Sequence, residues 1–510
     1  MKYWKFALFA ISLCFAPLLS AEDSAPKVMT SLGEVQGITE NGIRIFRGIP
    51  YAEPPIGDLR WQATQPKTAW EGTLDASDYG PQCPQGFGEQ TIPQDEDCLT
   101  INVWTPELIK EPLPVMFWIH GGAHVLGNGR IQGETFARDG VVLVSINYRL
   151  GPFGVFALSE IVKNTPEGEP TGNFHLLDQI EALKWVQREI GTFGGDPGKV
   201  TIFGVSAGGS NVNLLMMSPL SDGLFHGAIA QSAGNGLSPS LDLATQSFLD
   251  DRILGALSVD DLAGLRALPW YRIIQSGPDS RGPSGPIVDG IAVKENVHQA
   301  FQAGRQHDVP YIGGANSHEG SLRVFIPIPD YDQELEANRE ELAPFYGLES
   351  NDPSLVVDYY GDRLFVAPTR FIVSQMSKVN ASSWHYHFDW VLEDVDEHVP
   401  GAGHGSEVAY VFDSLETFTV PPEFAQAIGI PAGTYAPSAK DLETAALVHR
   451  YWINFAETGS PTHEDAFHWG EYTNENPQTL LISNDGHSMQ ENLRASQLSW
   501  IEDKALGPSE

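Results

Sequence analysis

A glycine-flanked serine places the strongest constraint on how this chain can fold. The pentapeptide Gly204-Val205-Ser206-Ala207-Gly208 directly follows the apolar run 200–203, and the segment 210–215 after it is compatible with a helix. In the pattern G-x-S-x-G, a serine between a strand and a helix lies on a sharp turn that exposes its hydroxyl. Small flanking residues let the neighbouring backbone pack closely. The pattern predicts a nucleophilic serine at Ser206, and an ordinary glycine-rich turn is the alternative.

Short apolar runs predict the strands of a buried parallel sheet. These runs are residues 115–119, 141–146, 200–203, 228–230 and 309–312. Between two of them, apolar residues recur at helical spacing from Leu176 to Ile190 and indicate an amphipathic helix. Strands that alternate with helices predict a doubly wound, mostly parallel α/β sheet. Active sites in such sheets form at the carboxyl ends of the strands, where Ser206 is placed.

A second glycine motif, His120-Gly121-Gly122-Ala123, follows the strand predicted over 115–119. A serine nucleophile needs a base, an acid that orients the base, and hydrogen-bond donors for the oxyanion that develops. This fold places donors in an H-G-G-x loop and at the residue after the nucleophile. We therefore expect the oxyanion hole to consist of the backbone N–H groups of Gly122, Ala123 and Ala207.

Residues 1–21 have the features of a secretory signal peptide. Lys2 and Lys5 precede the apolar run 6–19, and small residues follow at Ser20 and Ala21. We expect cleavage near Ala21, a secreted or periplasmic location, and a single domain over 22–510; an uncleaved membrane anchor is the alternative. No later segment is long and apolar enough to span a membrane, so none is expected in the mature chain.

Two cysteines, Cys83 and Cys98, remain after removal of the signal peptide. In an oxidising compartment a bridge between them would close a loop of about 15 residues and stabilise the fold by about 3 kcal/mol. Two free thiols are the alternative. We expect no metal site here, because neither cysteine has a close Cys or His partner.

The charge of the chain limits its partners. The formal net charge is −36, which argues against nucleic acids and anionic membranes because their phosphates would be repelled. No dinucleotide-binding or phosphate-binding loop occurs in a convincing context, so we expect no cofactor. The sequence carries no indication of an oligomeric state.

Further motifs give the chain a family resemblance. They are Arg47-Gly48-Ile49-Pro50-Tyr51-Ala52, Glu96-Asp97-Cys98-Leu99, Asn147-Tyr148-Arg149, Phe193-Gly194-Gly195-Asp196-Pro197 and Trp452-Ile453-Asn454-Phe455-Ala456. With these motifs and the serine pentapeptide, the chain resembles the type-B carboxylesterases of the α/β-hydrolase superfamily, which include para-nitrobenzyl esterases and cholinesterases. The resemblance implies an α/β-hydrolase fold whose helical excursions form the substrate pocket.

The resemblance also selects residues that the motifs alone do not. The acid of the family lies in an Asn-x-x-Glu-Gly segment, which here implies Glu319. The base lies in a segment similar to Gly-Ala-x-His-Gly, which implies His404 among the 15 histidines. The resulting order Ser206, Glu319, His404 is that of the superfamily. The family also pairs the cysteines that match Cys83 and Cys98.

The implied function is hydrolysis of small-molecule carboxylic esters through an acyl-enzyme on Ser206. A lipase, lactonase or amidase with the same triad, or a non-catalytic adhesion relative, is the alternative. Two positions depart from the family pattern. Val205 stands where cholinesterases carry Glu, which argues against choline esters. His124 stands where Phe or Tyr is common, and it is expected either to line the pocket or to pack as an aromatic substitute.

Overall fold

A computed structural model describes residues 25–86, 91–277, 285–420, 430–464 and 466–507. The predicted signal peptide, residues 1–21, lies outside the described residues. The helices found in the described part of the chain include none that is long and apolar enough to cross a membrane.

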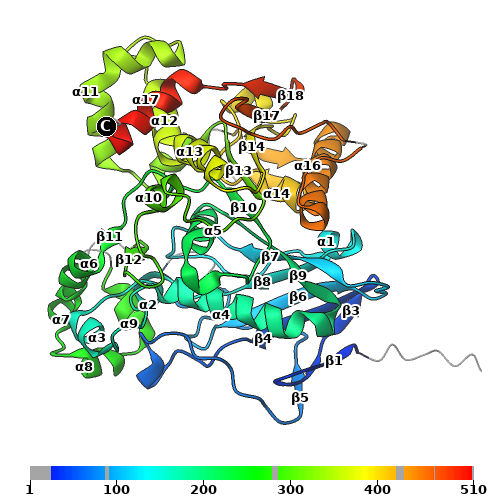
Figure 1. Ribbon diagram of the computed structural model, residues 1–510, viewed down its shortest axis with the longest axis vertical. Coiled ribbons are helices and arrows are strands. Elements are labelled where there is room, and N and C mark those ends of the chain that lie inside the picture. Colours follow the sequence, from blue (N-terminus) through cyan, green and yellow to red (C-terminus); the bar gives the residue numbers. More distant parts are fainter. Residues whose placement is uncertain (1–24, 87–90, 278–284, 421–429, 465, 508–510) are drawn as a thin grey trace, which may run out of the picture.

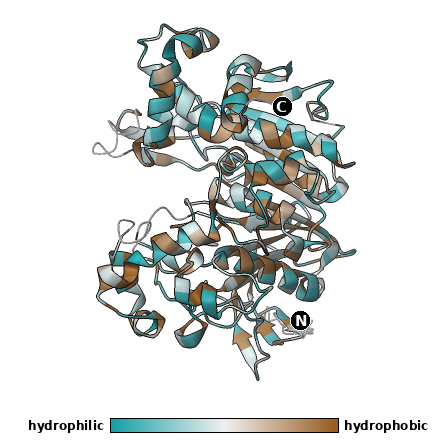
Figure 2. Ribbon diagram, turned by 60° about the vertical axis from the view of Figure 1, so that its left-hand side comes forward, coloured by the Kyte–Doolittle hydropathy of each residue, from teal (hydrophilic) through white to brown (hydrophobic). Residues whose placement is uncertain are grey.

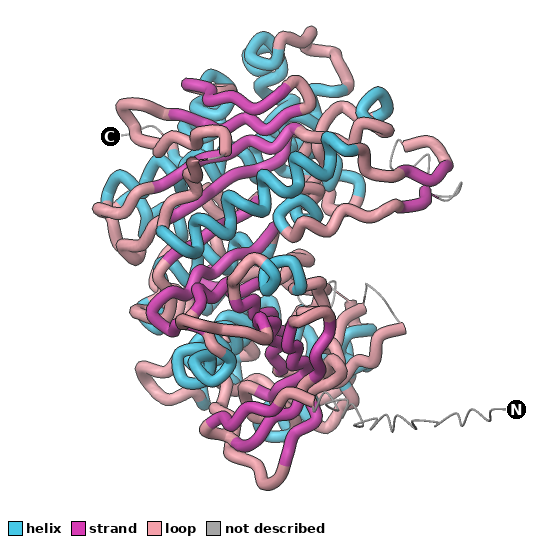
Figure 3. Tube along the Cα trace, turned by 90° about the vertical axis from the view of Figure 1, so that its right-hand side faces the viewer, coloured by secondary structure: helices cyan, strands magenta, loops and turns pink. Residues whose placement is uncertain are grey.

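A large mixed sheet runs through the molecule (Figure 1). Its strands are β3 (Ile38–Glu40), β4 (Ile43–Pro50), β6 (Thr100–Pro106), β7 (Leu113–Ile119), β8 (Val142–Ile146), β9 (Gly195–Val205), β10 (Gly227–Gln231), β13 (Tyr311–Asn316), β14 (Ser383–Asp389), β17 (Gln478–Ser483) and β18 (Gly486–Glu491). Their spatial order is β18-β17-β14-β13-β10-β9-β7-β8-β6-β4-β3. The strands from β8 to β17 are parallel, and antiparallel strands close both edges. Figure 3 shows these strands as a twisted band with helices on both sides.

Helices cover both faces of the sheet because the strands are apolar on both sides. In β7, Val115 and Phe117 face one hydrophobic cluster, whereas Met116 and Trp118 face another, as the alternation of side chains along a strand requires. In Figure 2 hydrophobic residues recur along the central strands and the helices packed on them. The first face is covered by α4 (Phe174–Glu189), α5 (Ala207–Met217), α10 (Val297–Gln302) and α13 (Ala367–Gln375), and the second by α1 (Glu134–Arg138), α14 (Val408–Val411) and α16 (Ala439–Thr458).

The five predicted strands are confirmed as β7, β8, β9, β10 and β13. The prediction of an amphipathic helix was wrong in one respect, because α4 is buried on nearly every side. Its polar residues are paired inside the protein. Asp178, for example, is fully buried and accepts hydrogen bonds from the Arg149 guanidinium at 2.7 and 2.9 Å. The periodic apolar stripe in the sequence shows that one face of the helix is buried. It does not show that other parts of the protein also cover the opposite, polar face.

Helical segments extend beyond the sheet between its later strands. After β10 the chain forms α6 (Leu243–Asp250), α7 (Arg252–Leu257), α8 (Leu262–Arg266) and α9 (Trp270–Gln275), and after β13 it forms α11 (Pro329–Tyr346) and α12 (Ser354–Gly361). The expected disulfide joins Cys83 and Cys98. Close to it, the buried Glu96 carboxylate accepts a hydrogen bond of 2.7 Å from the Arg60 guanidinium, which also donates to the carbonyl of Leu268 at 2.8 Å. The Glu96-Asp97-Cys98-Leu99 motif therefore attaches the first helical excursion to the body of the protein.

Candidate functional site

Ser206 lies on the sharp turn between β9 and α5. Its φ of 59° and ψ of −121° are strained for a residue with a side chain, and such strain is concentrated at functional sites. The turn packs directly on the end of β7: a Cβ atom added to Gly204 or Gly208 would lie 2.5 or 2.1 Å from the Ile119 carbonyl oxygen. The two glycines are therefore required by this close approach, as the pentapeptide pattern predicts.

The H-G-G-x loop lies beside the serine. A Cβ added to Gly121 would lie 2.7 Å from the Val205 carbonyl oxygen and 3.2 Å from Ser206 Cβ. Gly122 and Ala123 have positive φ values of 109° and 52°. No hydrogen bond within the described residues uses the N–H groups of these two residues. The N–H of Ala207, the first residue of α5, has no partner inside its own helix. These N–H groups are free to bind a negatively charged oxygen.

Glu319 and His404 are joined by a hydrogen bond. The Nδ1–H of His404 donates to Glu319 Oε2 at 2.5 Å. The other carboxylate oxygen of Glu319 accepts from the Ser232 hydroxyl at 2.5 Å and from the Asn316 N–H at 2.7 Å. Glu319 is 1% exposed, so these three donors replace water around its charge. The carboxylate is held in one orientation by these bonds and fixes the proton of His404 on Nδ1.

The His404 ring is positioned by packing and by its loop. Its ring centroid lies 4.4 Å from that of Phe365, and the backbone N–H of His404 donates to the Ser321 hydroxyl at 3.1 Å. Burial alone lowers the pKa of His404, but the Glu319 carboxylate, with a smaller effect from Glu407, outweighs burial and raises that pKa above its ordinary value of 6.5. The buried Nε2 atom has no hydrogen-bond partner within the described residues.

Strand register places these groups at one edge of the sheet. Val205, Gln231 and Gly314 are register partners on the adjacent parallel strands β9, β10 and β13. The chain therefore leaves the sheet at Ser206, Ser232 and the segment before Glu319 on neighbouring strands, about 5 Å apart. The Ser206 N–H donates to the Gln231 carbonyl at 2.9 Å. The structure thus brings Glu319 and His404 into direct contact and places Ser206 nearby, while His404 Nε2 does not bond to the serine.

A second buried carboxylate, which the sequence analysis missed, supports this arrangement. Glu407 is 1% exposed and accepts hydrogen bonds from Gln231 Nε2 at 3.0 Å and Asn316 Nδ2 at 2.6 Å. The carbonyl of Gln231 binds the N–H of Ser206, and the N–H of Asn316 binds Glu319. Burial, and then the charge of Glu319, raises the pKa of Glu407. The sequence signal that could have identified Glu407 is an acidic residue directly before the apolar run 408–411.

His124 packs as an aromatic substitute. Its Nε2 lies 3.0 Å from Asn211 Oδ1, and its ring meets that of His175 edge to face, with centroids 5.0 Å apart. Burial lowers the pKa of His124 to about 4, so the ring is neutral. Within the described residues, no group of three His, Cys, Asp or Glu side chains is arranged to hold a metal ion.

Comparisons with known proteins agree on one family. A sequence profile described as "Carboxylesterase family" matches residues 24–501. Fumonisin B1 esterase of Sphingopyxis macrogoltabida is 34% identical, with coverage of 92% of this chain and 88% of the relative. Para-nitrobenzyl esterase of Bacillus subtilis (strain 168) is also 34% identical, with coverage of 90% and 95%. The solved structure of a PNB esterase superposes with a TM-score of 0.76 at 30% identity and covers 93% of this chain and 99% of that structure.

Proposed function

Since this chain belongs to the carboxylesterase family, has the α/β-hydrolase fold and is therefore an ester-hydrolysing enzyme, we propose that it works through an acyl-enzyme on Ser206. The proposal rests on one observation above all. His404 is oriented by a buried carboxylate through Nδ1, while its Nε2 is left without a partner at the sheet edge where the Ser206 turn lies. A neutral imidazole in this tautomer is a base that can accept a proton at Nε2.

In the first half-reaction, Ser206 Oγ forms a bond to the ester carbonyl carbon while His404 Nε2 takes the hydroxyl proton. The carbonyl oxygen becomes an oxyanion that accepts hydrogen bonds from the N–H groups of Gly122, Ala123 and Ala207. The imidazolium is stabilised by the Glu319 carboxylate and then protonates the alkoxy oxygen. The bond to that oxygen breaks, and the alcohol leaves an acyl group on the serine.

The second half-reaction repeats these steps with water. His404 takes a proton from water as the water oxygen attacks the acyl carbon, and the same three N–H groups hold the oxyanion. The proton then passes to Ser206 Oγ, the bond between Oγ and the acyl carbon breaks, and the carboxylic acid is released. In unliganded enzymes, hydrogen bonds between the nucleophile and its base are often long and shorten when substrate binds. This is consistent with an unpartnered Nε2.

The substrates we propose are small-molecule carboxylic esters. Relatives named for esterase activity support this class, including the fumonisin B1 and para-nitrobenzyl esterases. The half-buried Val205 gives no carboxylate to attract a quaternary ammonium group, so choline esters are disfavoured. Lipase, lactonase and amidase activities would use the same residues, and rates on matched esters, triglycerides, lactones and amides separate these possibilities.

We place the enzyme outside the cytoplasm because residues 1–21 have the pattern of a signal peptide. Residues 22–510 would then form one catalytic domain. The disulfide between Cys83 and Cys98 supports an oxidising compartment.

The experiment that tests the proposal compares Ser206→Ala with Ser210→Ala. Both serines lie at the start of α5, one turn apart, and Ser210 accepts a hydrogen bond from the Gly234 N–H at 3.2 Å. With p-nitrophenyl butyrate as substrate, we expect kcat/KM to fall by several orders of magnitude for Ser206→Ala and by less than about tenfold for Ser210→Ala. Retention of most activity by a folded Ser206→Ala variant would refute the proposal.

A further inference from the structure

The donors of the proposed oxyanion hole lie on two separate segments of the chain. Gly122 and Ala123 belong to the loop after β7, whereas Ala207 is the first residue of α5. Their N–H groups can bind one oxygen together only if the loop and the helix stay at a fixed distance. A contact that joins the loop to α5 would therefore control the shape of the hole.

The loop needs such a contact because its backbone is strained. Gly122, Ala123 and His124 have consecutive positive φ values of 109°, 52° and 59°. For Ala and His this left-handed conformation is costly, and it persists only where the surrounding structure enforces it. Ala123 is exposed, whereas the side chain of His124 is buried. The His124 side chain is therefore the one that can anchor this part of the loop.

The imidazole of His124 joins the loop to α5. Its Nε2–H donates a hydrogen bond to Asn211 Oδ1 at 3.0 Å. Asn211 is fully buried and lies four residues after Ala207, so the two residues share one face of the helix. The His175 ring of α4 packs on the His124 ring edge to face. The contact thus runs from Ala123 through His124 and Asn211 to the first turn of α5.

The two histidines of the loop supply no positive charge to the oxyanion. Burial lowers the pKa of His120 and that of His124 to about 4. Both rings are therefore neutral at a pH where His404 acts as a base. A neutral ring that is hydrogen-bonded away from the substrate can affect the reaction only by fixing where the N–H groups point.

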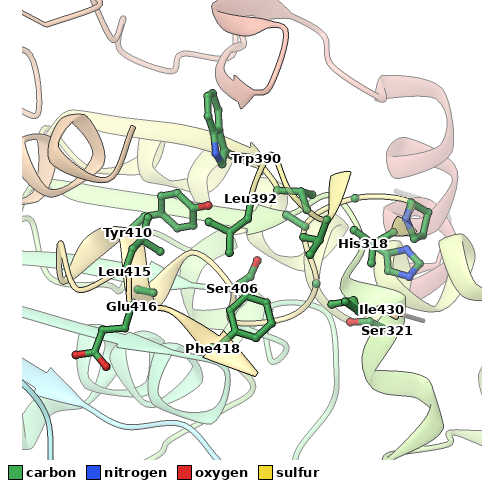
Figure 4. Close-up of a pocket in the computed structure, with 18 residues that line it drawn as sticks. His318, Ser321, Trp390, Leu392, Ser406, Tyr410, Leu415, Glu416, Phe418 and Ile430 are labelled. Carbon is green, nitrogen blue, oxygen red and sulfur yellow. The ribbon is translucent and has the colours of Figure 1, made fainter. Parts of the chain in front are cut away.

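The loop of the base has a different environment. A cavity of about 410 Å³ borders residues 399–403 and is also lined by His318 and Ser321, on either side of Glu319 (Figure 4). Residues 120–124 and Asn211 are not among the residues that line this cavity. A substitution at Asn211 therefore perturbs the oxyanion loop without direct contact with this part of the site.

We propose that the hydrogen bond between His124 and Asn211 positions the oxyanion hole, so that both are positioning residues for ester hydrolysis. This inference rests on the proposed function, because it assumes that the three N–H groups hold the oxyanion. The bond fixes the N–H groups of Gly122 and Ala123 relative to that of Ala207. Without it the strained loop relaxes away from α5. The oxyanion then loses hydrogen bonding, whereas the ground-state ester, which carries no such charge, binds almost unchanged.

The test compares Asn211→Leu with Asn213→Leu. Both asparagines are fully buried on α5, and Asn213 accepts a hydrogen bond from the Tyr311 hydroxyl at 2.8 Å and donates to Asn235 Oδ1 at 3.1 Å. Both variants lose buried hydrogen bonds, but only Asn211 bonds to His124. Asn211→Asp keeps an acceptor for the imidazole, and His124→Phe keeps an aromatic ring but removes the donor.

Two readouts separate positioning from stability. The first is kcat and KM for p-nitrophenyl butyrate, with thermal unfolding measured in parallel. The second is the inhibition constant of 1,1,1-trifluorodecan-2-one. In its adduct Ser206 Oγ bonds to the ketone carbon, the hydroxyl proton moves to His404 Nε2, and the carbonyl oxygen becomes an oxyanion without any leaving group. This constant therefore reports on the oxyanion hole.

We expect Asn211→Leu and His124→Phe each to lower kcat by about 10- to 100-fold, because displaced donors cost less than a donor that is removed. KM should change by less than about threefold, and the inhibition constant should rise by the factor by which kcat falls. The double variant should be no worse than either single variant. Asn211→Asp and Asn213→Leu should keep kcat within about fivefold of the wild type, although Asn213→Leu lowers the unfolding temperature.

The inference is overturned if Asn211→Leu and Asn213→Leu have the same kcat, or if the loss in Asn211→Leu lies in KM and leaves the inhibition constant unchanged. Ser206→Ala separates this result from the proposed function. Ketone binding that does not depend on Ser206 refutes the proposed function and this inference together. If binding depends on Ser206 while the two asparagine variants behave alike, only this inference fails. His124→Phe and Asn211→Asp decide the question if Asn211→Leu does not fold.

Discussion

Replacing the Glu319 carboxylate with an amide should reverse the tautomer of His404. In Glu319→Gln, the side chain keeps one oxygen acceptor and gains an NH₂ donor. Oε1 faces two donors, the Ser232 hydroxyl and the Asn316 N–H, so the amide oxygen should occupy that position. In the opposite orientation the amide NH₂ group would face these two buried donors. Each donor left unsatisfied would cost about 1–3 kcal/mol. The NH₂ group then faces His404 Nδ1 at the position of Oε2 and makes this nitrogen an acceptor.

With Nδ1 accepting, the single proton of the neutral ring moves to Nε2, and His404 can no longer accept a proton from the serine. The neutral amide also gives no charge to stabilise the imidazolium. A wrong tautomer of this kind in a serine hydrolase lowers kcat about 10⁴-fold, which is about 5 kcal/mol of barrier. We therefore expect kcat for p-nitrophenyl butyrate to fall by about four orders of magnitude, with little change in KM.

Glu189→Gln is the matched control for this prediction. Glu189 is also 1% exposed, and its carboxylate also accepts from a serine hydroxyl and a backbone N–H, both of Ser31, but none of its hydrogen bonds involves a histidine. Thermal unfolding measures what each amide costs in stability. If a folded Glu319→Gln enzyme keeps more than a tenth of wild-type kcat, the reasoning about the tautomer is refuted.

Three other outcomes follow from the geometry. The pKa of His404 is raised, and only its neutral form accepts a proton, so kcat/KM should fall with decreasing pH through a midpoint above 6.5; a flat profile from pH 5 to 8 would contradict this. Replacing Cys83 and Cys98 with Ala should lower the free energy of unfolding by about 3 kcal/mol in urea titrations while leaving kcat intact, and unchanged stability would argue against the bridge. Gly121→Ala should reduce kcat by about 10²-fold, because its Cβ would displace the backbone of the serine turn, and wild-type kinetics would show that the loop tolerates this contact.

The sequence predicted the elements whose signals are local. The runs at 115–119 and 200–203 are apolar on both faces of a strand and are read directly as buried strands. The glycines around Ser206 are fixed by backbone contacts within a few residues of the turn and the end of β7. The doubly wound sheet then follows from alternating strands and helices, and the position of Ser206 at its carboxyl edge follows from the order of the elements.

The acid and the base could not be derived from local patterns. Glu319 and His404 are 85 residues apart, and only the parallel pairing of β13 with its neighbours brings their loops together. The family resemblance supplied this long-range information. It did not supply Glu407, whose partners Gln231 and Asn316 are 176 and 91 residues away. The burial of a polar residue such as Asp178 depends in the same way on pairing across the tertiary structure.

The central claim is that Ser206 is the residue that becomes acylated. Intact-mass and peptide mass spectrometry after reaction with a fluorophosphonate tests it directly, because this reagent forms a stable bond with an activated serine. We predict one label per chain, on the peptide that contains Ser206, and loss of labelling in Ser206→Ala. A label on another residue, or a labelled Ser206→Ala protein, would contradict the account.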